Sequence, residues 1–334
     1  MNAQPKPAEH AGFAAALLHW YDQHARALPW REDRDPYRVW LSEIMLQQTR
    51  VAAAVEHYRK FLKKFPEVGK LARAREGSVL AAWSGLGYYR RARMLHSAAN
   101  VVVKEYGGEF PRTAEGLRAL PGIGRYTAAA IASIAFDEPM AVVDGNVERV
   151  LARLNGRRID GEELWEAAQR LLESAAVSRA RPGDFNQAMM ELGATVCVPG
   201  PPKCLLCPVA HRCATRGELA ASSTKAKQKK RSVVYGLARR ERQVWLVQRG
   251  NHESLMAGMW ELPQMESPNG DHFTLYELRH SITVTDYTVR VVACQGADAE
   301  RVGATAGKWF PQSRLPALAL TGLARKILRR AGLI

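Results

Sequence analysis

Four cysteines lie within the stretch Cys197-Val-Pro-Gly-Pro-Pro-Lys-Cys204-Leu-Leu-Cys207-Pro-Val-Ala-His-Arg-Cys213, which constrains the fold more than any other part of the chain. Its prolines prevent a continuous helix, so this segment must loop, and four thiolates on one loop can surround a single metal centre. The spacing favours an iron–sulfur cluster, and a structural zinc ion is the alternative. However, zinc sites usually pair two short knuckles, and here only Cys204 and Cys207 are so spaced.

Disulfides are a weaker interpretation of the same cysteines. The first residues, MNAQPKPAEH, have neither the charge nor the apolar run of a targeting segment, so we expect a reducing compartment. No apolar run approaches the roughly 20 residues needed to span a bilayer, so we expect no membrane partner and a cytoplasmic location, associated with the nucleoid in a bacterium.

The charge of the chain favours a polyanionic partner. Its net charge is +15, and lysines and arginines that neutralise phosphates release condensed counterions, which makes nucleic acid the first candidate. A basic surface that serves only solubility is the alternative. With 334 residues and 47% hydrophobic content, the chain can bury a sizeable core and is expected to form two or three domains.

One carboxylate lies within an apolar helix pattern near the N-terminus. Helices are predicted over residues 9–30 and 37–65, the second starting at Asp35-Pro36, where Asp can cap and Pro suits the first turn. Glu43 falls on the apolar stripe of that second helix, so its side chain should face protein rather than water. It is either a buried acid paired with an arginine such as Arg31, or a desolvated acid that keeps its proton near neutral pH.

Two loops have features of DNA contact. The stretch Trp83-Ser-Gly-Leu86-Gly-Tyr88-Tyr-Arg-Arg-Ala-Arg93 places apolar tips beside arginines, as a DNA wedge requires, although an ordinary basic helix connection would look similar. The stretch Leu120-Pro-Gly122-Ile-Gly124-Arg-Tyr126-Thr127, between a helix ending near Ala119 and an alanine-rich helix through Phe136, is a helix-hairpin-helix. Its two glycines allow a tight turn and close approach to a phosphate, and the next helix presents free N–H groups.

Asp144 lies in Ala141-Val-Val-Asp-Gly-Asn-Val147, just before a helix rich in arginine. An aspartate at such a junction is most often a helix cap, and that is its default interpretation when it is considered alone.

The order and approximate spacing of Glu43, the hairpin at 120–124, Asp144 and the four cysteines resemble the endonuclease III superfamily of DNA glycosylases over about residues 10–215. Within it, Tyr37-Arg-Val-Trp-Leu-Ser-Glu43-Ile-Met-Leu-Gln47-Gln48-Thr49 and Val143-Asp144-Gly145-Asn146-Val147 resemble the MutY-type adenine DNA glycosylases. The resemblance implies a two-lobed, mainly α region over residues 1–220, with the helix-hairpin-helix at about 115–136 and a [4Fe–4S] cluster on Cys197, Cys204, Cys207 and Cys213.

The resemblance also implies chemical roles. Glu43 would protonate the flipped adenine at N7 and later handle the water, Asp144 would stabilise or capture the sugar cation, and Tyr126 and Asn146 would support them. Breaking an N-glycosidic bond passes through a cationic sugar, which calls for one protonated acid and one ionised carboxylate. Bifunctional relatives carry a lysine where this chain has Tyr126, and tyrosine cannot form a Schiff base. A monofunctional hydrolase that leaves an abasic site is therefore expected.

Further positions match DNA-contacting positions of the family, although each is equally compatible with core or surface. Those around the flipped base are Arg26, Trp30, Arg31, Leu46 and Gln187. Those near an opposing 8-oxoguanine are Gln48, Thr49, Leu86 and Tyr88, while Gly122 and Gly124 belong to the hairpin. The expected partner is duplex DNA with adenine opposite 8-oxoguanine or guanine, bound by a monomer. The rivals are a bifunctional pyrimidine-lesion glycosylase and a non-catalytic iron–sulfur DNA-binding or sensing protein.

A basic linker is predicted over 221–231, followed by an α+β domain over 232–334 with strands at 233–237, 244–247 and 281–292 and a basic helix at 321–330. This domain resembles the family's Nudix-like domain that reads 8-oxoguanine. The Nudix catalytic box is missing, since residues 264–275 contain only Glu266 and Asp271 as acids, so pyrophosphate hydrolysis is not expected. Many relatives have Phe-Ser-His where this chain has Ile282-Thr283-Val284, so Thr283 would be the remaining polar contact. Cys294 is expected to be a buried thiol.

Overall fold

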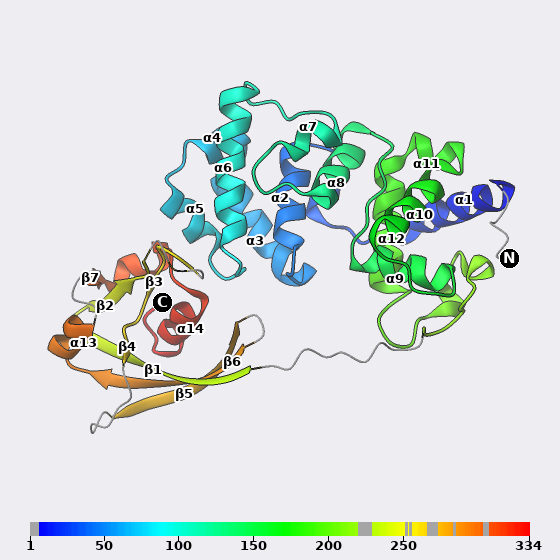
Figure 1. Ribbon diagram of the computed structural model, residues 1–334. Coiled ribbons are helices and arrows are strands. Elements are labelled where there is room, and N and C mark those ends of the chain that lie inside the picture. Colours follow the sequence, from blue (N-terminus) through cyan, green and yellow to red (C-terminus); the bar gives the residue numbers. More distant parts are fainter. Residues whose placement is uncertain are drawn as a thin grey trace. The chain divides into compact units, whose positions relative to one another are not determined.

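The computed structural model describes residues 7–219, 229–250, 253, 256–265, 273–282, 285–302 and 307–334 (Figure 1). The chain forms two compact units, each described by itself below. The first unit comprises Met1–Ala72 and Ser97–Ser222, and the second comprises Arg73–His96 and Ser223–Ile334. The sequence placed all of residues 1–220 in one helical region, whereas in the structure residues 73–96 belong to the unit that contains the C-terminal residues.

The first unit is helical and includes most of the helices shown in blue and green in Figure 1. Its elements are α1 (Pro7–His24), η1 (Pro29–Arg31), α2 (Pro36–Leu46), α3 (Val51–Lys64), α4 (Val68–Ala72), α7 (Ala114–Arg118), α8 (Arg125–Phe136), α9 (Gly145–Leu154), α10 (Gly161–Glu173), α11 (Ala176–Ala180), α12 (Pro182–Thr195), η2 (Cys204–Leu206) and η3 (Ala210–Arg212), where η marks a 3₁₀ helix. Helix α5 (Glu76–Trp83) lies in the second unit, and α6 (Arg90–Glu105) begins there and ends in the first.

The long helices predicted near the N-terminus are each interrupted. Asp35 caps α2 as expected, since its side chain accepts a hydrogen bond from the backbone N–H of Arg38 at 3.0 Å. The single helix predicted over 37–65 is wrong, because α2 ends at Leu46 and α3 begins at Val51. Between them Gln48 has φ 55°, which no α-helix accommodates. The helix predicted over 9–30 likewise ends at His24, and Pro29 opens a separate 3₁₀ turn.

Helix α12 is central to the first unit, because it packs against α1, α8 and α9. One core cluster joins α1, α9, α10 and α12 and includes Leu17, Leu151 and Leu192. Helices α2 and α3 contribute a further set of fully buried aromatic side chains, among them Trp40 and Phe61. The end of α2 and the starts of α8 and α9 are thereby held near α12, and these helix ends form the candidate site.

The second unit contains a sheet in the strand order β3-β2-β1-β6-β5, with β4 paired to β1 and β7 to β2. Strands β1 and β6 are parallel and the other pairs antiparallel. The elements are β1 (Lys229–Arg240), β2 (Gln243–Gln248), β3 (Trp260–Glu261), β4 (Gln264–Met265), β5 (Thr274–Ile282), β6 (Thr285–Cys294), α13 (Gly296–Val302), β7 (Gly307–Pro311), η4 (Gln312–Ala317) and α14 (Gly322–Arg330).

The predicted basic helix is present as α14, which Thr321 caps by accepting a hydrogen bond from the N–H of Ala324 at 3.2 Å. Its apolar face contributes Leu323 and Ile327 to a core shared with strands of the sheet. The strand predicted over 281–292 is divided, because residues 281–282 end β5 and residues 285–292 lie in β6.

Two expectations about this unit concern particular residues. Cys294 is half-buried rather than fully buried, and burial raises the pKa of its thiol to about 11. Glu266, Asp271 and Thr283 lie outside the described residues. Within the part of the chain that is described, no helix is both long enough and apolar enough to cross a membrane.

Candidate active site

Glu43 is a buried acid on α2 with 6% of its surface exposed. The hydroxyl of Tyr126, in the first turn of α8, donates a hydrogen bond to Glu43 Oε2 at 2.7 Å. Burial raises the pKa of the Glu43 carboxyl to about 7. The Tyr126 hydrogen bond and the charge of Arg31 lower this pKa, while Asp144 raises it. The environment therefore keeps a substantial fraction of this acid protonated at neutral pH.

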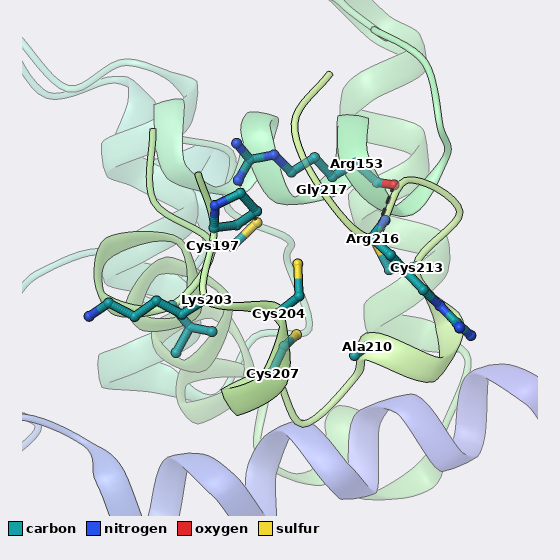
Figure 2. Close-up of a pocket in the computed structure, with 11 residues that line it drawn as sticks. Arg153, Cys197, Lys203, Cys204, Cys207, Ala210, Cys213, Arg216 and Gly217 are labelled. Carbon is teal, nitrogen blue, oxygen red and sulfur yellow. Dashed lines mark hydrogen bonds between the residues drawn. The ribbon is translucent and has the colours of Figure 1, made fainter. Parts of the chain in front are cut away.

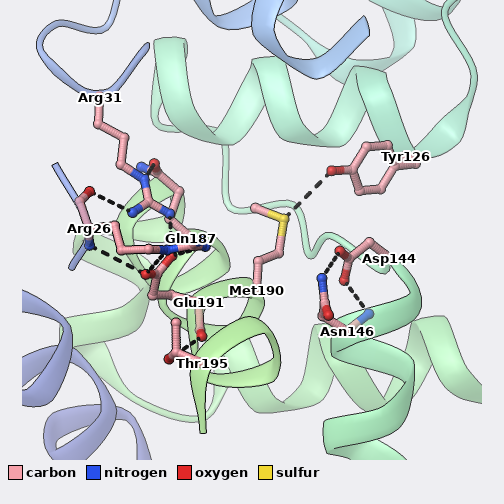
Figure 3. Close-up of polar contacts among 9 residues, drawn as sticks. All are labelled: Arg26, Arg31, Tyr126, Asp144, Asn146, Gln187, Met190, Glu191 and Thr195. Carbon is pink, nitrogen blue, oxygen red and sulfur yellow. Dashed lines mark hydrogen bonds and ion pairs between the residues drawn. The ribbon is translucent and has the colours of Figure 1, made fainter. Parts of the chain in front are cut away.

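Tyr126 is the neighbour that joins Glu43 to α12. Its hydroxyl also lies 3.6 Å from the thioether sulfur of Met190, the contact drawn in Figure 3. Burial, together with the carboxylates of Glu43 and Asp144, raises the pKa of Tyr126 well above its usual value. The phenol therefore remains a hydrogen-bond donor, and the apolar Met190 side chain helps to exclude water from it.

Asp144 is the N-cap of α9, as its default interpretation predicted. Its Oδ1 accepts hydrogen bonds from the backbone N–H groups of Asn146 and Val147 at 2.9 and 2.8 Å, and its Oδ2 accepts one from the Asn146 side chain at 2.8 Å. These donors, at the positive end of the helix dipole, stabilise a negative charge on the carboxylate. The cap therefore fixes the orientation of a charged carboxylate whose field reaches Glu43.

Arg149 connects Asn146 to the cysteine loop, and sequence patterns did not single it out from the other arginines in and after α9. Its guanidinium donates to Asn146 Oδ1 at 2.8 Å, to the carbonyl of Cys197 at 2.8 Å and to the carbonyl of Gly193 at 2.7 Å. Gly193 lets α9 approach, because a Cβ there would lie 2.5 Å from the Cβ of Asn146. The orientation of Asn146, and through it that of Asp144, therefore depends on α12 and on the start of the cysteine loop.

Arg31 is not the direct partner of Glu43 that one interpretation proposed. It donates to Gln187 Oε1 and to Glu191 Oε2, both at 3.0 Å, while Arg26 donates to both carboxylate oxygens of Glu191 at 2.5 and 2.9 Å (Figure 3). Burial alone would raise the pKa of Glu191, but the hydrogen bonds and charges of the two arginines bring it below its usual value. Glu191 was not identified from the sequence. Like Glu43, it is a carboxylate among apolar residues of a helix, and the structure buries its side chain fully.

The remaining predicted contact residues are distributed over both units. In the first, Trp30 is buried against Tyr58, Leu46 and Thr49 are half-buried, and Gln48 is exposed at the break between α2 and α3. Leu86 and Tyr88 belong to the second unit, and Thr283 lies outside the described residues.

The two hairpin glycines have different backbone conformations. Gly122 adopts φ 77°, which favours glycine, whereas Gly124 has φ −90° and extended backbone. Of the two, only Gly122 therefore needs to be glycine for a tight turn. At Gly124 a Cβ would meet nothing within 4 Å, so the missing side chain leaves open space before the first N–H groups of α8.

The four predicted metal ligands, Cys197, Cys204, Cys207 and Cys213, line one small cavity of about 30 Å³ in the first unit. All four are free thiols, so the disulfide interpretation is wrong, and Figure 2 shows side chains from the loop gathered around the same hollow. Arg153 is buried beside them and donates to Cys197 Sγ at 3.2 Å and to two loop carbonyls at 2.9 Å. Among the described residues, no three His, Cys, Asp or Glu side chains are arranged around one ion. An all-sulfur donor set beside a buried cation suits a thiolate-held iron–sulfur group.

Comparisons with known proteins each cover a part of the chain. Residues 41–174 match the family described as HhH-GPD superfamily base excision DNA repair protein. The chain is 50% identical over 234 residues to the adenine DNA glycosylase of Mus musculus, covering 64% of this chain and 44% of the mouse protein. It therefore spans less than half the length of that relative.

Two other comparisons cover more of the related protein. Over 243 residues the chain is 35% identical to the adenine DNA glycosylase of Buchnera aphidicola subsp. Schizaphis graminum, covering 70% of this chain and 67% of that protein. A solved structure of a thermostable thymine-DNA glycosylase matches with a TM-score of 0.57 and 31% identity, covering 63% of this chain and 97% of that one.

Proposed function

Because this chain belongs to the HhH-GPD superfamily of base excision DNA repair proteins, and within it to the adenine DNA glycosylases, we propose that it hydrolyses the N-glycosidic bond of adenine opposite 8-oxoguanine or guanine in duplex DNA. The observation that best supports this activity is the buried carboxyl of Glu43, with its pKa at about 7 and the Tyr126 hydroxyl donating to it. An acid poised near neutral pH can protonate a leaving base.

In the proposed reaction the adenine is rotated out of the duplex, and protonated Glu43 donates its proton to N7. The bond between the sugar and N9 then breaks, and its electron pair leaves with the adenine. The negative charge of Asp144 stabilises the cationic sugar, because a fixed charge in a buried site acts strongly on developing charge. Water adds to the sugar carbon and gives a proton to ionised Glu43, which leaves free adenine and an abasic site. Tyr126 and Asn146 hold the two carboxylates in place.

The contacts to DNA are proposed from the positions that match the family. Arg26 and Arg31, held by Glu191, and Gln187, which accepts a hydrogen bond from Arg31, would line the pocket for the flipped base together with Trp30 and Leu46. Gln48 and Thr49 from the first unit would face the opposing base, as would Leu86, Tyr88 and Thr283 from the second. Residues 232–334 would act as a Nudix-like domain that recognises 8-oxoguanine, and the hairpin at Gly122 and Gly124 would hold a phosphate. The protein would act as a monomer and would be located with the cellular DNA.

We propose that Cys197, Cys204, Cys207 and Cys213 hold a [4Fe–4S] cluster. A single zinc ion is the alternative, but zinc sites usually pair two short knuckles, and only Cys204 and Cys207 are so spaced. The cluster would supply rigidity to a loop whose exposed residues include Lys203 and His211, and these two side chains would face phosphates. Purified protein should be yellow-brown, absorb at about 400 nm and contain about four irons per chain. A colourless and fully active zinc protein would refute the assignment.

Single-turnover cleavage tests the proposed activity against its rivals. Duplexes with adenine opposite 8-oxoguanine, adenine opposite guanine, and thymine glycol are incubated with excess protein and analysed with and without alkali. We expect release of adenine from the first two, fastest opposite 8-oxoguanine, with strand breaks only after alkali. Cleavage of the thymine glycol duplex without alkali would identify a bifunctional pyrimidine-lesion enzyme. Binding without any base release would identify a non-catalytic protein.

A further inference from the structure

The loop between α5 and α6, residues 84–89 in the second unit, holds an aromatic side chain in an unusual backbone conformation. Gly85, Gly87 and Tyr88 all have positive φ, at 108°, 71° and 48°. Tyr88 is 46% exposed, while Leu86 is buried. A non-glycine residue at positive φ persists only where its surroundings fix it, and such residues are frequent at functional sites.

Contacts within the loop fix part of this conformation. The indole N–H of Trp83 donates to the carbonyl of Gly87 at 3.1 Å, and the guanidinium of Arg91 lies over the rings of Trp83 and Tyr88, at 5.4 and 5.5 Å from their centroids. Tyr88 is therefore presented as an exposed ring with a cation against one face.

The base of the loop is fixed by residues more than two hundred positions later in the chain, 318–325, which we name the C-terminal strap. The hydroxyls of Ser84 and Tyr89 both lie 3.3 Å from the carbonyl of Leu320 and donate to it. Arg325 donates from Nε to Ser84 Oγ at 2.7 Å and from Nη2 to the carbonyl of Leu318 at 3.3 Å. The loop is thus tied to two points of the strap.

The strap is itself held firmly. Leu320 is fully buried, and on either side of it the backbone of Trp260 exchanges hydrogen bonds with Ala319 at 2.8 Å and Thr321 at 3.0 Å. Arg325 is half-buried, and burial lowers the pKa of its guanidinium. A cation is costly to bury unless its donors are satisfied, so Arg325 serves better as a fixed internal donor than as a surface charge.

We propose that Arg325 and the C-terminal strap position loop 84–89 so that Tyr88 stacks between bases of duplex DNA beside the mispair. Arg325 and the strap would thereby contribute to recognition through a loop from an earlier part of the chain, without touching DNA themselves. An aromatic ring already held in its binding conformation loses less entropy when it stacks, so a rigid loop binds more tightly than a mobile one. The inference rests on the proposed function, since it requires a duplex as the ligand.

A double-mutant cycle tests it in the full-length protein. Arg325→Met, Tyr88→Ala and the double variant are compared with Arg329→Met, a control that removes the same charge from an exposed position of α14. The dissociation constant is measured for a duplex that places 2′-fluoro-2′-deoxyadenosine, which resists cleavage, opposite 8-oxoguanine. We expect Arg325→Met to weaken binding about tenfold and Arg329→Met less than about twofold. In the Tyr88→Ala background, Arg325→Met should add almost nothing, because both changes remove one stacking interaction.

The adenine-release rate at saturating protein should remain unchanged in Arg325→Met, because Glu43 and Asp144 are intact. The dependence of binding on salt should also be unchanged, whereas an arginine that contacts a phosphate would lower its slope by about one. Additive losses in the double variant, or equal losses in Arg325→Met and Arg329→Met, would overturn the proposal. If wild-type protein releases no adenine, it is the proposed function that fails instead.

A second variant keeps the test decisive if Arg325→Met does not fold. Tyr89→Phe removes only a hydroxyl, and with it the hydrogen bond to the carbonyl of Leu320 and the one from the N–H of Gly85 at 3.4 Å. We expect it to weaken binding at least twofold, again with no added loss beside Tyr88→Ala. Wild-type affinity in folded Tyr89→Phe would contradict positioning by the strap.

Discussion

Replacing Glu43 by glutamine should abolish base release and at the same time stabilise the protein above neutral pH. The pKa of this carboxyl is raised from 4.5 to about 7, and burial is the largest cause. At pH 7 about half of the Glu43 side chains are then protonated, against about 0.3% for an ordinary glutamate, so the environment raises the concentration of the acid by about 150-fold. Glutamine keeps the shape and still accepts a hydrogen bond from Tyr126, but it has no proton to give.

The sign of the stability effect follows from proton linkage. Because the folded-state pKa lies above the unfolded value, the folded state loses no stability below about pH 4.5, where both states are protonated. Between about pH 4.5 and 7 the unfolded chain ionises first, so stability falls, and above pH 7 the full penalty remains. A shift from 4.5 to about 7 corresponds to a penalty of about 3 kcal/mol, at about 1.36 kcal/mol per pKa unit.

The assay is the difference in melting temperature between Glu43→Gln and wild type as a function of pH. We expect almost no difference at pH 4.5 and a gain of several degrees for the variant at pH 8. Glu191→Gln is the matched control, because Glu191 is also a buried carboxylate but one whose pKa the two arginines lower. That variant should lose stability at pH 8, since it leaves Arg26 and Arg31 without their counter-charge.

Two results would refute this reasoning. A Glu43→Gln protein less stable than wild type at pH 8 would mean that the carboxylate is a satisfied structural acid. Adenine release within tenfold of wild type would mean that Glu43 is not the proton donor. In wild-type protein the rate of release should fall about tenfold per pH unit above pH 7, as the acid is lost.

Three further predictions concern the neighbours of Glu43. Asp144→Asn should slow adenine release at least about 100-fold in single-turnover assays yet melt near the wild-type temperature, because asparagine caps a helix as well as aspartate does. Arg149→Met, which frees Asn146 and the carbonyl of Cys197, should lower both the iron content per chain and the release rate, whereas normal values of both would show that the link is dispensable. Wild-type protein should give no borohydride-trapped complex with DNA, and Tyr126→Lys should give one, because an amine then lies beside the sugar.

Much of this protein can be predicted from local sequence. The start of α2 follows from Asp35-Pro36, the hairpin turn from Gly122 and the cap of α9 from Asp144, because each depends on hydrogen bonds or backbone angles within a few residues. The burial of Glu43 follows from its place on an apolar helix face. The clustering of the four thiols follows from their short separation along a loop that cannot be helical.

Other features depend on which distant segments of the chain pack together, and local sequence patterns do not predict this packing. The ion pairs of Glu191 join residues more than 150 positions apart, and Gly193 is required only because Asn146 lies against it. The break in the helix predicted over 37–65 has no proline or glycine to mark it. Loop 84–89 is fixed by residues 318–325, although nothing near either segment indicates the other. Sequence therefore specified the chemical groups and the local turns, while tertiary packing decided which buried charges are paired, which remain protonated, and which parts of the chain hold the candidate DNA-contacting residues in place.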